Sequence, residues 1–416
     1  MTQPAAPHPT ANSTTAPRRS ARRGWAGAAA VGALVVALGA GTVTGAQAAG
    51  TLPPPDAQAL RASITGLPNA DLTSAVVLVD GAGGRWSGTS GSGELGTDRP
   101  VMADGRFRIG SISKVFTATV LLQLAGEHRV SLDGTVQQYL PGTLPASYPP
   151  ITVRQLLNHT SGLPTGGDLG GDDGGAQWFV DHATEGWTPQ QVVAEAVGQP
   201  MRFQPGTAQQ YNGLNYYLAG LLVERVTGHS YAHEVDARIL RPLGLRNTSV
   251  PAADDTRLPH PTAHVYLTLP GPDGSTEQAD VTEQSPWPWA EGGLVSSAPD
   301  LDRFLSALLR GRLLAPAQQA ELFAVPDVPN VQNQNCDIGP TAGRACFSTG
   351  LMRFTAPDGT VLWGKTGSRP GYTNGVFATR DASRDLVYSL SPTSRGGASF
   401  AAQYRIAAAA FGLAGH

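Results

Sequence analysis

Two β-rich segments lie at opposite ends of this 416-residue chain and enclose a helical middle. Near the N-terminus, Ser74–Asp80 and Arg85–Ser90 predict two strands joined by a Gly-rich turn. Further strands are predicted near the C-terminus at Gly350–Phe354, Thr360–Gly364, Tyr372–Thr379 and Asp385–Ser391. Helices are predicted at Pro55–Leu67 and Ser399–Phe411, and the middle, from Ser111 to Phe323, is mostly helical. The pattern predicts an α+β fold in which one sheet is flanked by helices and carries a helical insertion.

The first 48 residues have the features of a secretory signal peptide. Arg18, Arg19, Arg22 and Arg23 precede an apolar stretch from Ala26 to Gly45, and Ala46-Gln47-Ala48 offers a cleavage site. An uncleaved anchor is the alternative, but the Gly-rich stretch and the small-residue triplet favour removal. Export by the general or the twin-arginine route fits equally. We therefore expect a secreted protein of residues 49–416 without a stable membrane anchor.

Charge and cysteine content limit the partners of the mature chain. Loss of the four leader arginines changes the net charge from −3 to −7, so there is no electrostatic basis for binding nucleic acid. Cys336 and Cys346 are close in sequence and are exported together, which predicts a disulfide. Neither cysteine has a histidine motif beside it, so a catalytic thiol is not expected.

The chain has only two lysines, Lys114 and Lys365, against 27 arginines. Arginine replaces lysine wherever a surface charge suffices, but a guanidinium cannot release and regain a proton. Lys114 ends the sequence Ser111-Ile112-Ser113-Lys114, which precedes an apolar, helix-compatible run. At that spacing Ser111 and Lys114 share a helix face, and burial and the helix dipole favour a neutral amine able to activate the serine. Lys365 begins Lys365-Thr366-Gly367 after a predicted strand, whose edge could bind a substrate backbone.

No metal or other cofactor is expected. His229 and His233, like His260 and His264, stand four residues apart, but neither pair encloses the Glu of a zinc-protease helix. The Gly/Asp-rich loop at Leu163–Gln177 lacks the ligand spacing of a calcium loop. We interpret both histidine pairs as structural and the loop as a surface connection.

Six ordered segments together resemble the penicillin-recognising serine hydrolases, in the branch of class C β-lactamases and serine D-Ala-D-Ala carboxypeptidases. The segments are Phe107–Lys114, Ile151–Leu163 with Asn158-His159-Thr160-Ser161-Gly162, Phe203–Gly220, Leu240–Leu245, Gly292–Leu301 and Lys365–Gly367. The resemblance covers about Leu67 to the C-terminus. It implies the β-lactamase/transpeptidase-like sandwich, an antiparallel sheet flanked by helices, with a mostly helical insertion at about 115–323.

The resemblance also implies a role for each matching residue. Ser111 would form an acyl-enzyme with Lys114 as its proton partner, and Tyr211 would be the second proton carrier. Lys365, Thr366 and Gly367 would bind the substrate, and the backbone N–H groups of Ser111 and Ser368 would form the oxyanion hole. Trp287 and Arg353 match a substrate-lining aromatic and a carboxylate-binding arginine, the latter with a one-residue shift. His159 would be structural, and no Gly-x-Ser-x-Gly motif supports a Ser-His-Asp triad.

The middle motif departs from the family pattern. Where relatives have Tyr-x-Asn, this chain has Tyr211-Asn212-Gly213. The missing asparagine normally binds the substrate amide and orients the neighbouring lysine, and Asn212 or Asn215 could compensate. Loss of one such hydrogen bond corresponds to about 1–3 kcal/mol of transition-state binding.

The first function predicted is D-Ala-D-Ala carboxypeptidase-like cleavage of peptidoglycan peptides by a monomer that penicillins acylate. A class C-like β-lactamase and an esterase or D-amino-acid amidase of the same fold are alternatives. The glycine at position 213 favours the esterase, because an ester needs less amide recognition. A non-catalytic penicillin-binding scaffold is a fourth possibility, against which Ser111, Lys114, Tyr211 and Lys365 argue together.

Overall fold

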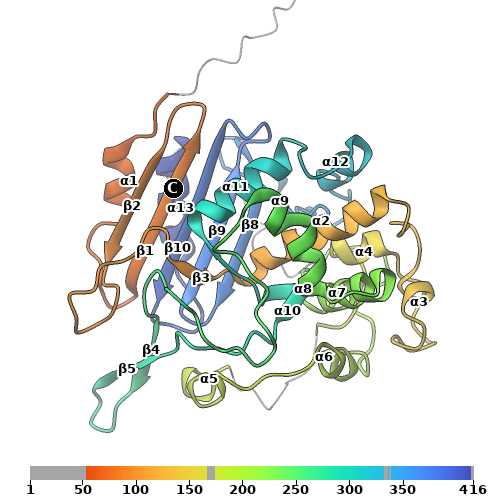
Figure 1. The fold of residues 1–416 in the computed structure, drawn as a ribbon, viewed down its shortest axis with the longest axis horizontal. Coiled ribbons are helices and arrows are strands. Elements are labelled where there is room, and N and C mark those ends of the chain that lie inside the picture. The colour runs from red at the N-terminus through yellow and green to blue at the C-terminus, as the bar shows by residue number, and fades with distance from the viewer. Residues whose placement is uncertain (1–52, 166–173, 332–335, 337–338, 414–416) are drawn as a thin grey trace, which may run out of the picture. The chain divides into compact units, whose positions relative to one another are not determined.

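The fold is built around one antiparallel sheet of six strands (Figure 1). The computed structural model describes residues 53–165, 174–331, 336 and 339–413, so the expected leader lies outside the described residues. The strand order is β2-β1-β10-β9-β8-β7. The bounds are Leu72–Gly81 (β1), Trp86–Gly91 (β2), Met352–Thr355 (β7), Val361–Arg369 (β8), Tyr372–Ala378 (β9) and Arg384–Pro392 (β10). The two ends of the chain meet where β1 pairs with β10, as the sequence predicted.

Each face of the sheet is covered by helices. Side chains alternate between the faces with a period of two. Val77 and its neighbours on one face pack against Leu60 of α1 (Ala57–Ser63) and Ile406 of α13 (Phe400–Phe411). Val76 on the other face belongs to the larger core, which includes Phe304 of α11 (Ala298–Leu309). The sheet is therefore the middle layer of the predicted sandwich.

The helix that follows the Ser-x-x-Lys motif runs through the larger core. Helix α2 (Ser113–Gly126) buries eleven of its fourteen residues, and Phe116 stacks on Phe304 with ring centroids 3.8 Å apart. A helix that is apolar on all sides is stable only when it is surrounded by protein. The 3₁₀ turn η1 (Gly110–Ile112), which leads into α2, is thereby fixed against the sheet and contacts β8.

The middle of the chain is mostly helical, and many of its helices begin at a capping residue. Thr135, Thr152 and Thr188 form reciprocal capping boxes with the glutamine three residues later. The helices are α3 (Val136–Tyr139), α4 (Val153–Leu157), α5 (Ala176–His182), α6 (Pro189–Ala196), α7 (Leu214–Thr227), α8 (Tyr231–Val235), η3 (Asp236–Leu240), α9 (Arg241–Leu243), α10 (Trp289–Gly292), α12 (Pro316–Leu322) and the later turn η5 (Gly339–Thr341). Within the described residues, none of the helices is long and apolar enough to cross a membrane.

Two small strand pairs in this region were not predicted. Strand β3 (Arg106–Arg108) pairs with β6 (Val295–Ser297), and β4 (Tyr266–Pro270) forms a hairpin with β5 (Thr276–Asp280). The first pair has three residues per strand, too few to show a periodic pattern. Strand β5 is almost entirely exposed and polar, so it carries no alternation of apolar residues.

Candidate active site

The turn that carries Ser111 lies directly against strand β8. A Cβ atom on Gly110 would lie 2.5 Å from the carbonyl oxygen of Ser368, and Gly110 also has a φ of +53°. A Cβ atom on Gly367 would lie 2.0 Å from the carbonyl oxygen of Ile109. Only glycine permits both the close approach and the positive φ. The two glycines therefore bring the backbone of Ser111 next to that of Ser368.

Strand β8 is longer than predicted and has an open edge beside this turn. The prediction ended the strand at Gly364, but it continues to Arg369 because residues 365–369 pair with β9. Strand β7 pairs with β8 only as far as Gly364. The edge of Lys365–Arg369 away from β9 thus faces η1 instead of another described strand.

Lys114 is buried beside Ser111 and is surrounded by three oxygen acceptors. Its Nζ lies 3.0 Å from Ser111 Oγ and 2.7 Å from the carbonyl oxygen of Glu291, and it also forms an ion pair with the Glu291 carboxylate. Burial alone would lower the pKa of Lys114, but the charge of Glu291, with a further contribution from Tyr211, outweighs it and the pKa is raised. The expected neutral amine is therefore corrected, since Glu291 keeps Lys114 as an ammonium ion with three protons for three acceptors.

The Tyr211 ring lies between the two lysines. Lys114 Nζ is 5.0 Å and Lys365 Nζ is 4.7 Å from its centroid. Burial would raise the pKa of Tyr211, but the two lysine charges outweigh it, so the pKa is lowered. Burial, with the Lys114 charge, lowers the pKa of Lys365. The Tyr211 hydroxyl is buried and has no hydrogen-bond partner among the described residues, which leaves it available to a substrate group.

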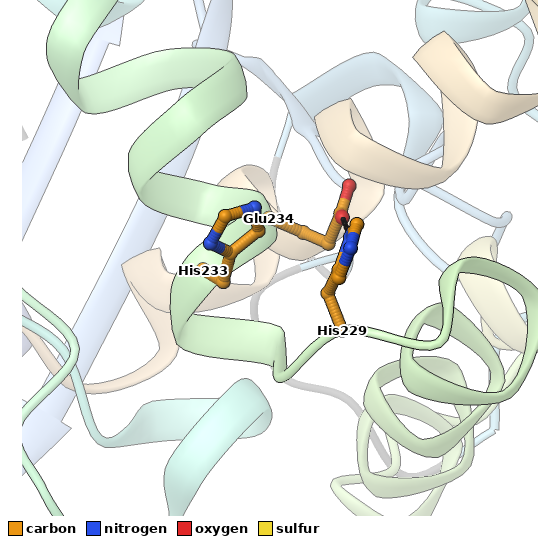
Figure 2. Close-up of side chains that lie close together, drawn as sticks. All are labelled: His229, His233 and Glu234. Carbon is orange, nitrogen blue, oxygen red and sulfur yellow. Dashed lines mark hydrogen bonds and ion pairs between the residues drawn. The ribbon is translucent and has the colours of Figure 1, made fainter.

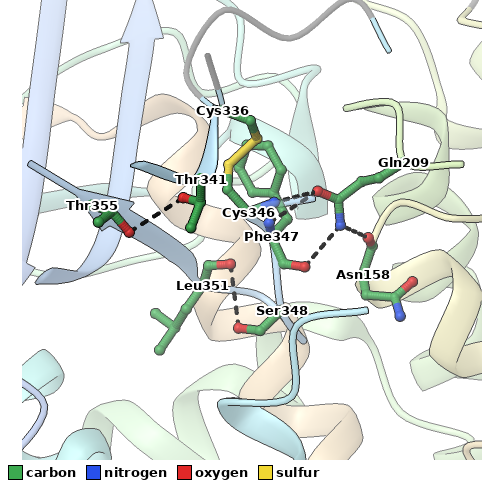
Figure 3. Close-up of a disulfide and its surroundings, with 9 residues drawn as sticks. All are labelled: Asn158, Gln209, Cys336, Thr341, Cys346, Phe347, Ser348, Leu351 and Thr355. Atoms are coloured by element: carbon green, nitrogen blue, oxygen red, sulfur yellow. Dashed lines mark hydrogen bonds between the residues drawn. A yellow bond between two sulfur atoms is a disulfide. The ribbon is translucent and has the colours of Figure 1, made fainter. Parts of the chain in front are cut away.

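The predicted disulfide is present, and Figure 3 shows it with Phe347 and Gln209 beside it. Cys346 is bonded to Cys336, and the next residue, Phe347, packs on the Tyr211 ring with centroids 5.2 Å apart. Gln209 accepts hydrogen bonds from the backbone N–H groups of Cys346 and Phe347 at 2.9 and 3.0 Å, and donates to the carbonyl oxygens of Phe347 and Asn158. This buried amide ties the disulfide loop to the wall behind Tyr211.

Asn212 and Asn215 do not take the place of the missing asparagine. Asn212 Nδ2 donates to the carbonyl oxygens of Leu163 and Pro164, both at 2.9 Å, and its Oδ1 accepts from Leu214 N. Asn215 Oδ1 accepts a hydrogen bond from Ser161 Oγ at 2.6 Å, and its Nδ2 faces His159 Nδ1 at 3.3 Å. The prediction that Asn212 binds substrate is corrected, because its donors are used to hold the loop after the Asn158–Gly162 segment.

His159 packs beneath the site as part of the same wall. Its ring lies 4.5 Å from the Tyr211 ring, and its Nδ1 accepts a hydrogen bond from Asn212 N at 3.2 Å. Burial, together with the charges of Lys114 and Lys365, places the pKa of His159 well below its ordinary value. His159 is therefore neutral at pH 7, because a protonated ring would be a further buried positive charge near two lysines.

The other predicted site residues occupy three different places. Thr366 and Ser368 lie on the open edge of β8, where Thr366 is half-buried and Ser368 is exposed. Trp287 is half-buried and makes an edge contact with Trp187 at 5.2 Å, in a hollow of about 420 Å³ that Trp289 also lines. Arg353 lies in β7 opposite Trp363, in the part of the sheet where β8 is already paired. Among the described residues, Arg353 forms no hydrogen bond or ion pair with Ser111 or Lys365.

Two charged residues of the site were missed by sequence reasoning. Glu291 belongs to the short helix α10 and contacts Lys114 through both its carbonyl and its carboxylate. Arg369 ends β8, where its guanidinium donates to Gln284 Oε1 and to the carbonyl oxygen of Ser285, each at 3.2 Å. Burial lowers the pKa of Arg369 to about 10. The sequence did contain a signal for Glu291. It is an acidic residue directly before Gly292-Gly293, in a chain that lacks the asparagine of the Tyr-x-Asn motif.

One group of potential metal ligands occurs in the described residues, and Figure 2 shows it. The ligand atoms of His229, His233 and Glu234 lie within 4.8 Å of one another. His229 Nδ1 bonds one Glu234 oxygen at 2.8 Å, and Arg238 Nε bonds the other. A metal ion would have to compete with the Arg238 charge for this carboxylate, so the donor set suits an ion-pair network better than a metal centre. Part of the Gly/Asp-rich loop, residues 166–173, lies outside the described residues.

A nucleophile, an ammonium group, a buried phenol and a second lysine therefore meet at one open strand edge, and these are the parts of a serine acyl-transfer site. The profile of the Beta-lactamase family matches residues 18–411, and the chain belongs to this family. It is a serine hydrolase of the superfamily that contains β-lactamases and penicillin-binding proteins. The predicted fold class is confirmed.

Similar proteins have several different activities. Penicillin-binding protein 4* of Bacillus subtilis (strain 168) is 26% identical over 72% of this chain, and Esterase EstB of Burkholderia gladioli is 29% identical over 50%. The aligned regions span 63% and 58% of the lengths of those two proteins. A solved D-stereospecific amidohydrolase from Streptomyces sp. is 32% identical, with a TM-score of 0.73, over 86% of this chain and all of that one. The D-amino acid amidase of Ochrobactrum anthropi SV3 (TM-score 0.67, covering 85% of this chain and 97% of its own) is 24% identical and shows the fold alone.

Proposed function

We propose that this protein hydrolyses amide bonds of D-amino acyl compounds through an acyl-enzyme on Ser111. The observation that carries the proposal is the contact between Lys114 Nζ and Ser111 Oγ, at 3.0 Å, beside a buried phenol without a hydrogen-bond partner among the described residues. A weak alcohol nucleophile needs a nearby group that accepts its proton. The lowered pKa of Tyr211 suits that task, because two lysine ammonium groups stabilise its phenolate.

In this mechanism Ser111 Oγ attacks the substrate carbonyl carbon while its proton passes to the Tyr211 oxygen. Lys114 is an ammonium ion whose N–H groups hold Ser111 in place and stabilise the charge of the phenolate. The backbone N–H groups of Ser111 and Ser368 stabilise the negative oxygen of the tetrahedral intermediate. Tyr211 then gives its proton to the leaving nitrogen as the C–N bond breaks. Water attacks the acyl-Ser111 carbonyl in the second half of the reaction, and Tyr211 again accepts and returns the proton.

The choice of substrate class rests on two observations. The Streptomyces relative, which is named for D-stereospecific amide hydrolysis, aligns over its full length with this chain. The cations expected to receive a terminal carboxylate are less suited to it, because Lys365 is buried with its Nζ on the Thr366 carbonyl and Arg353 lies in the neighbouring strand β7. A D-amino acyl amide needs no such carboxylate site. D-Ala-D-Ala carboxypeptidase activity, the first function predicted from sequence, is an alternative outcome of the same test.

The test compares four kinds of substrate on one purified enzyme. These are D- and L-aminoacyl amides, a D-Ala-D-Ala peptide, a short aryl ester and a chromogenic cephalosporin. We expect the D-aminoacyl amide to be hydrolysed at least about tenfold faster than its L isomer, a discrimination of about 1.4 kcal/mol. Fastest turnover of the D-Ala-D-Ala peptide would establish the carboxypeptidase instead, and fastest turnover of the cephalosporin a β-lactamase.

The role of Ser111 is tested by intact-mass spectrometry with the same substrates and with a penicillin. Wild-type protein should gain the mass of one acyl group, and Ser111→Ala should gain none and lose turnover. Ser87→Ala removes an exposed hydroxyl from β2 and is the matched control. It should keep both the acyl mass gain and the turnover. Full activity of Ser111→Ala would contradict the mechanism.

The proposal that the protein is secreted has separate support. The described residues contain a disulfide, and disulfides persist in oxidising compartments. N-terminal sequencing of the protein recovered from culture medium should begin at or near Ala49. A mature protein that retains residues 1–48 would overturn this proposal.

A further inference from the structure

The short helix α10 brings Glu291 to Lys114 from a distant part of the chain. The two residues are 177 positions apart, yet Lys114 donates to both the carbonyl oxygen and the carboxylate of Glu291. Trp289, which begins α10, has a φ of +44°, an uncommon value for a residue with a side chain. Lys114 is fully buried, whereas the side chain of Glu291 retains 21% of its exposure. A buried ammonium ion needs such a partner, because an unpaired charge is strongly disfavoured in the interior.

The Glu291 carboxylate lies next to the place that a side chain at position 213 would occupy. A Cβ atom on Gly213 would lie 3.4 Å from both Cδ and Oε2 of Glu291, which is ordinary van der Waals contact. The three nearest atoms all belong to the Glu291 carboxylate. Gly213 has a φ of −66°, a value that every residue adopts. The backbone therefore does not require glycine at position 213, and the group that a larger side chain would meet there is Glu291.

The charges around Tyr211 give this carboxylate a further effect. Two lysines flank the phenol, and without an anion they would be two buried like charges on one site. Glu291 is the one carboxylate among the described residues that forms an ion pair with either lysine. It thus allows Lys114 to stay charged beside Lys365, and both ammonium groups can then stabilise the Tyr211 phenolate.

We propose that Glu291 is a positioning residue that keeps Lys114 charged and directed at Ser111, in the space left by Gly213. It acts through Lys114 and does not touch the reacting atoms. Gly213 leaves room beside the carboxylate, so a side chain larger than a methyl group at position 213 would compete with Glu291 for this space. The assignment rests on the proposed function for its kinetic readout, but its main readout is the protonation of Lys114 itself.

The chain's two lysines make that protonation directly measurable. Labelling with [¹³C]lysine gives two Cε signals, and Lys365→Met identifies which belongs to Lys114. We expect Glu291→Gln to lower the pH at which Lys114 titrates, because the carboxylate favours the charged amine. Glu283→Gln removes an exposed acid eight residues away and should leave the titration unchanged. A Lys114 titration that is the same in wild type and Glu291→Gln would overturn the proposal, whether or not any substrate is turned over.

The kinetic readout is the pH profile of kcat/KM on the best substrate. Removing the carboxylate lowers the pKa of Lys114, so the limb of the profile that reports Lys114 should move to lower pH. The maximum should fall about tenfold to a hundredfold, as expected for the loss of a charged hydrogen bond. Glu291→Asp keeps the charge and should keep the limbs in place. A uniform loss of activity with unmoved limbs would show a merely structural role and contradict the proposal.

The pairing of Glu291 with Gly213 is tested by a double-mutant cycle. Gly213→Asn alone should reduce activity, because the new side chain displaces the carboxylate. Glu291→Ala combined with Gly213→Asn removes the overlap and should be more active than either single variant. Additive effects in the cycle, or full activity of Gly213→Asn alone, would overturn the shared-volume argument. Absence of turnover on every substrate would refute the proposed function and leave the lysine titration as the deciding measurement.

Discussion

The protein contains two buried groups of charges that are built in opposite ways. In the active site, Lys114 and Lys365 flank the Tyr211 ring and Lys114 forms an ion pair with the Glu291 carboxylate, so unlike charges meet. At strands β1 and β10, on the face that α11 covers, Asp302 of α11 lies near Asp385 of β10 and Asp80 of β1, so like charges meet. Asp80 and Asp385 are direct cross-strand partners. Like charges in that position oppose each other.

The two groups respond to burial differently. Burial and the neighbouring acids raise the pKa of Asp302 to about 6 and that of Asp385 to about 8. One oxygen of each carboxyl has no hydrogen-bond partner among the described residues. Asp385 therefore holds a proton at pH 7 and Asp302 binds one below about pH 6, whereas Lys114 keeps its charge by pairing with Glu291. The difference shows that burial alone does not decide the charge of a group, because the sign of its neighbours does.

The largest expected effect comes from removing the one active-site hydroxyl that no described residue binds. Tyr211→Phe deletes no hydrogen bond of the described structure, so the free energy of unfolding should change by less than about 0.5 kcal/mol. The acylation rate should fall about 10²- to 10⁴-fold, because the proton carrier is lost. Stopped-flow acylation and thermal melting check the two halves.

Tyr216→Phe is the matched control for that prediction. The Tyr216 hydroxyl donates to the carbonyl oxygen of Leu157 at 2.8 Å, so its loss should destabilise the fold by about 1 kcal/mol and leave acylation largely intact. The two substitutions, both near the start of α7, therefore separate an effect on catalysis from an effect on stability. If Tyr211→Phe is acylated at the wild-type rate, the paired charges around Tyr211 do not contribute to catalysis.

Asp385→Asn should have an intermediate effect, on stability alone. The folded-state pKa of Asp385 lies above its unfolded value, so its contribution to stability is complete below about pH 4 and is lost as pH rises through about 8. Asparagine does not titrate and avoids that loss. The melting temperature of Asp385→Asn should therefore exceed that of wild type by several degrees at pH 8, and by much less at pH 5.

An exposed acid provides the control for the pH dependence. Asp273→Asn, in the turn of the β4–β5 hairpin, should show the wild-type slope of melting temperature against pH. If Asp385→Asn shows that same slope, the two acids are charged in the folded protein and the contrast with the active site disappears.

The smallest expected effect is at Arg85, a cation that contacts two of these acids. Arg85 lies 2.6 Å from an Asp80 oxygen and 3.7 Å from Asp302, but half of its side chain is exposed. Arg85→Ala should destabilise the protein by less than about 1 kcal/mol, and the difference should shrink in high salt. Urea denaturation at two ionic strengths measures it. A loss of several kcal/mol would mean that Arg85 neutralises the acids as Glu291 neutralises Lys114.

The sequence predicted the parts of the fold that have a clear local pattern. Both β-rich ends and the terminal helices were found, because β1 and β10 contain runs of Val and Leu and helix α13 has a clear Ser399 cap. The continuation of β8 to Arg369 was missed, since Ser368 and Arg369 give no strand signal of their own. That continuation is set by pairing with β9, which is a long-range property.

The active site was predicted as a set of residues but not as a set of charges. The motifs and the family resemblance together gave Ser111, Lys114, Tyr211 and Lys365, which the fold brings together. Motif spacing gave the wrong protonation of Lys114, because the decisive neighbour, Glu291, comes from a four-residue helix far along the chain. Local sequence describes a side chain's chemistry, whereas its pKa depends on partners that only the tertiary fold supplies.

The meeting of distant segments at β8 also has a kinetic consequence for folding. Ser111, Tyr211, Glu291 and Lys365 come from four separate elements, and contacts between residues so far apart in sequence form late when a chain folds. No fragment of the chain holds a complete site. Recovery of covalent labelling at Ser111 after dilution from denaturant should therefore report the final assembly step, later than the recovery of helical signal.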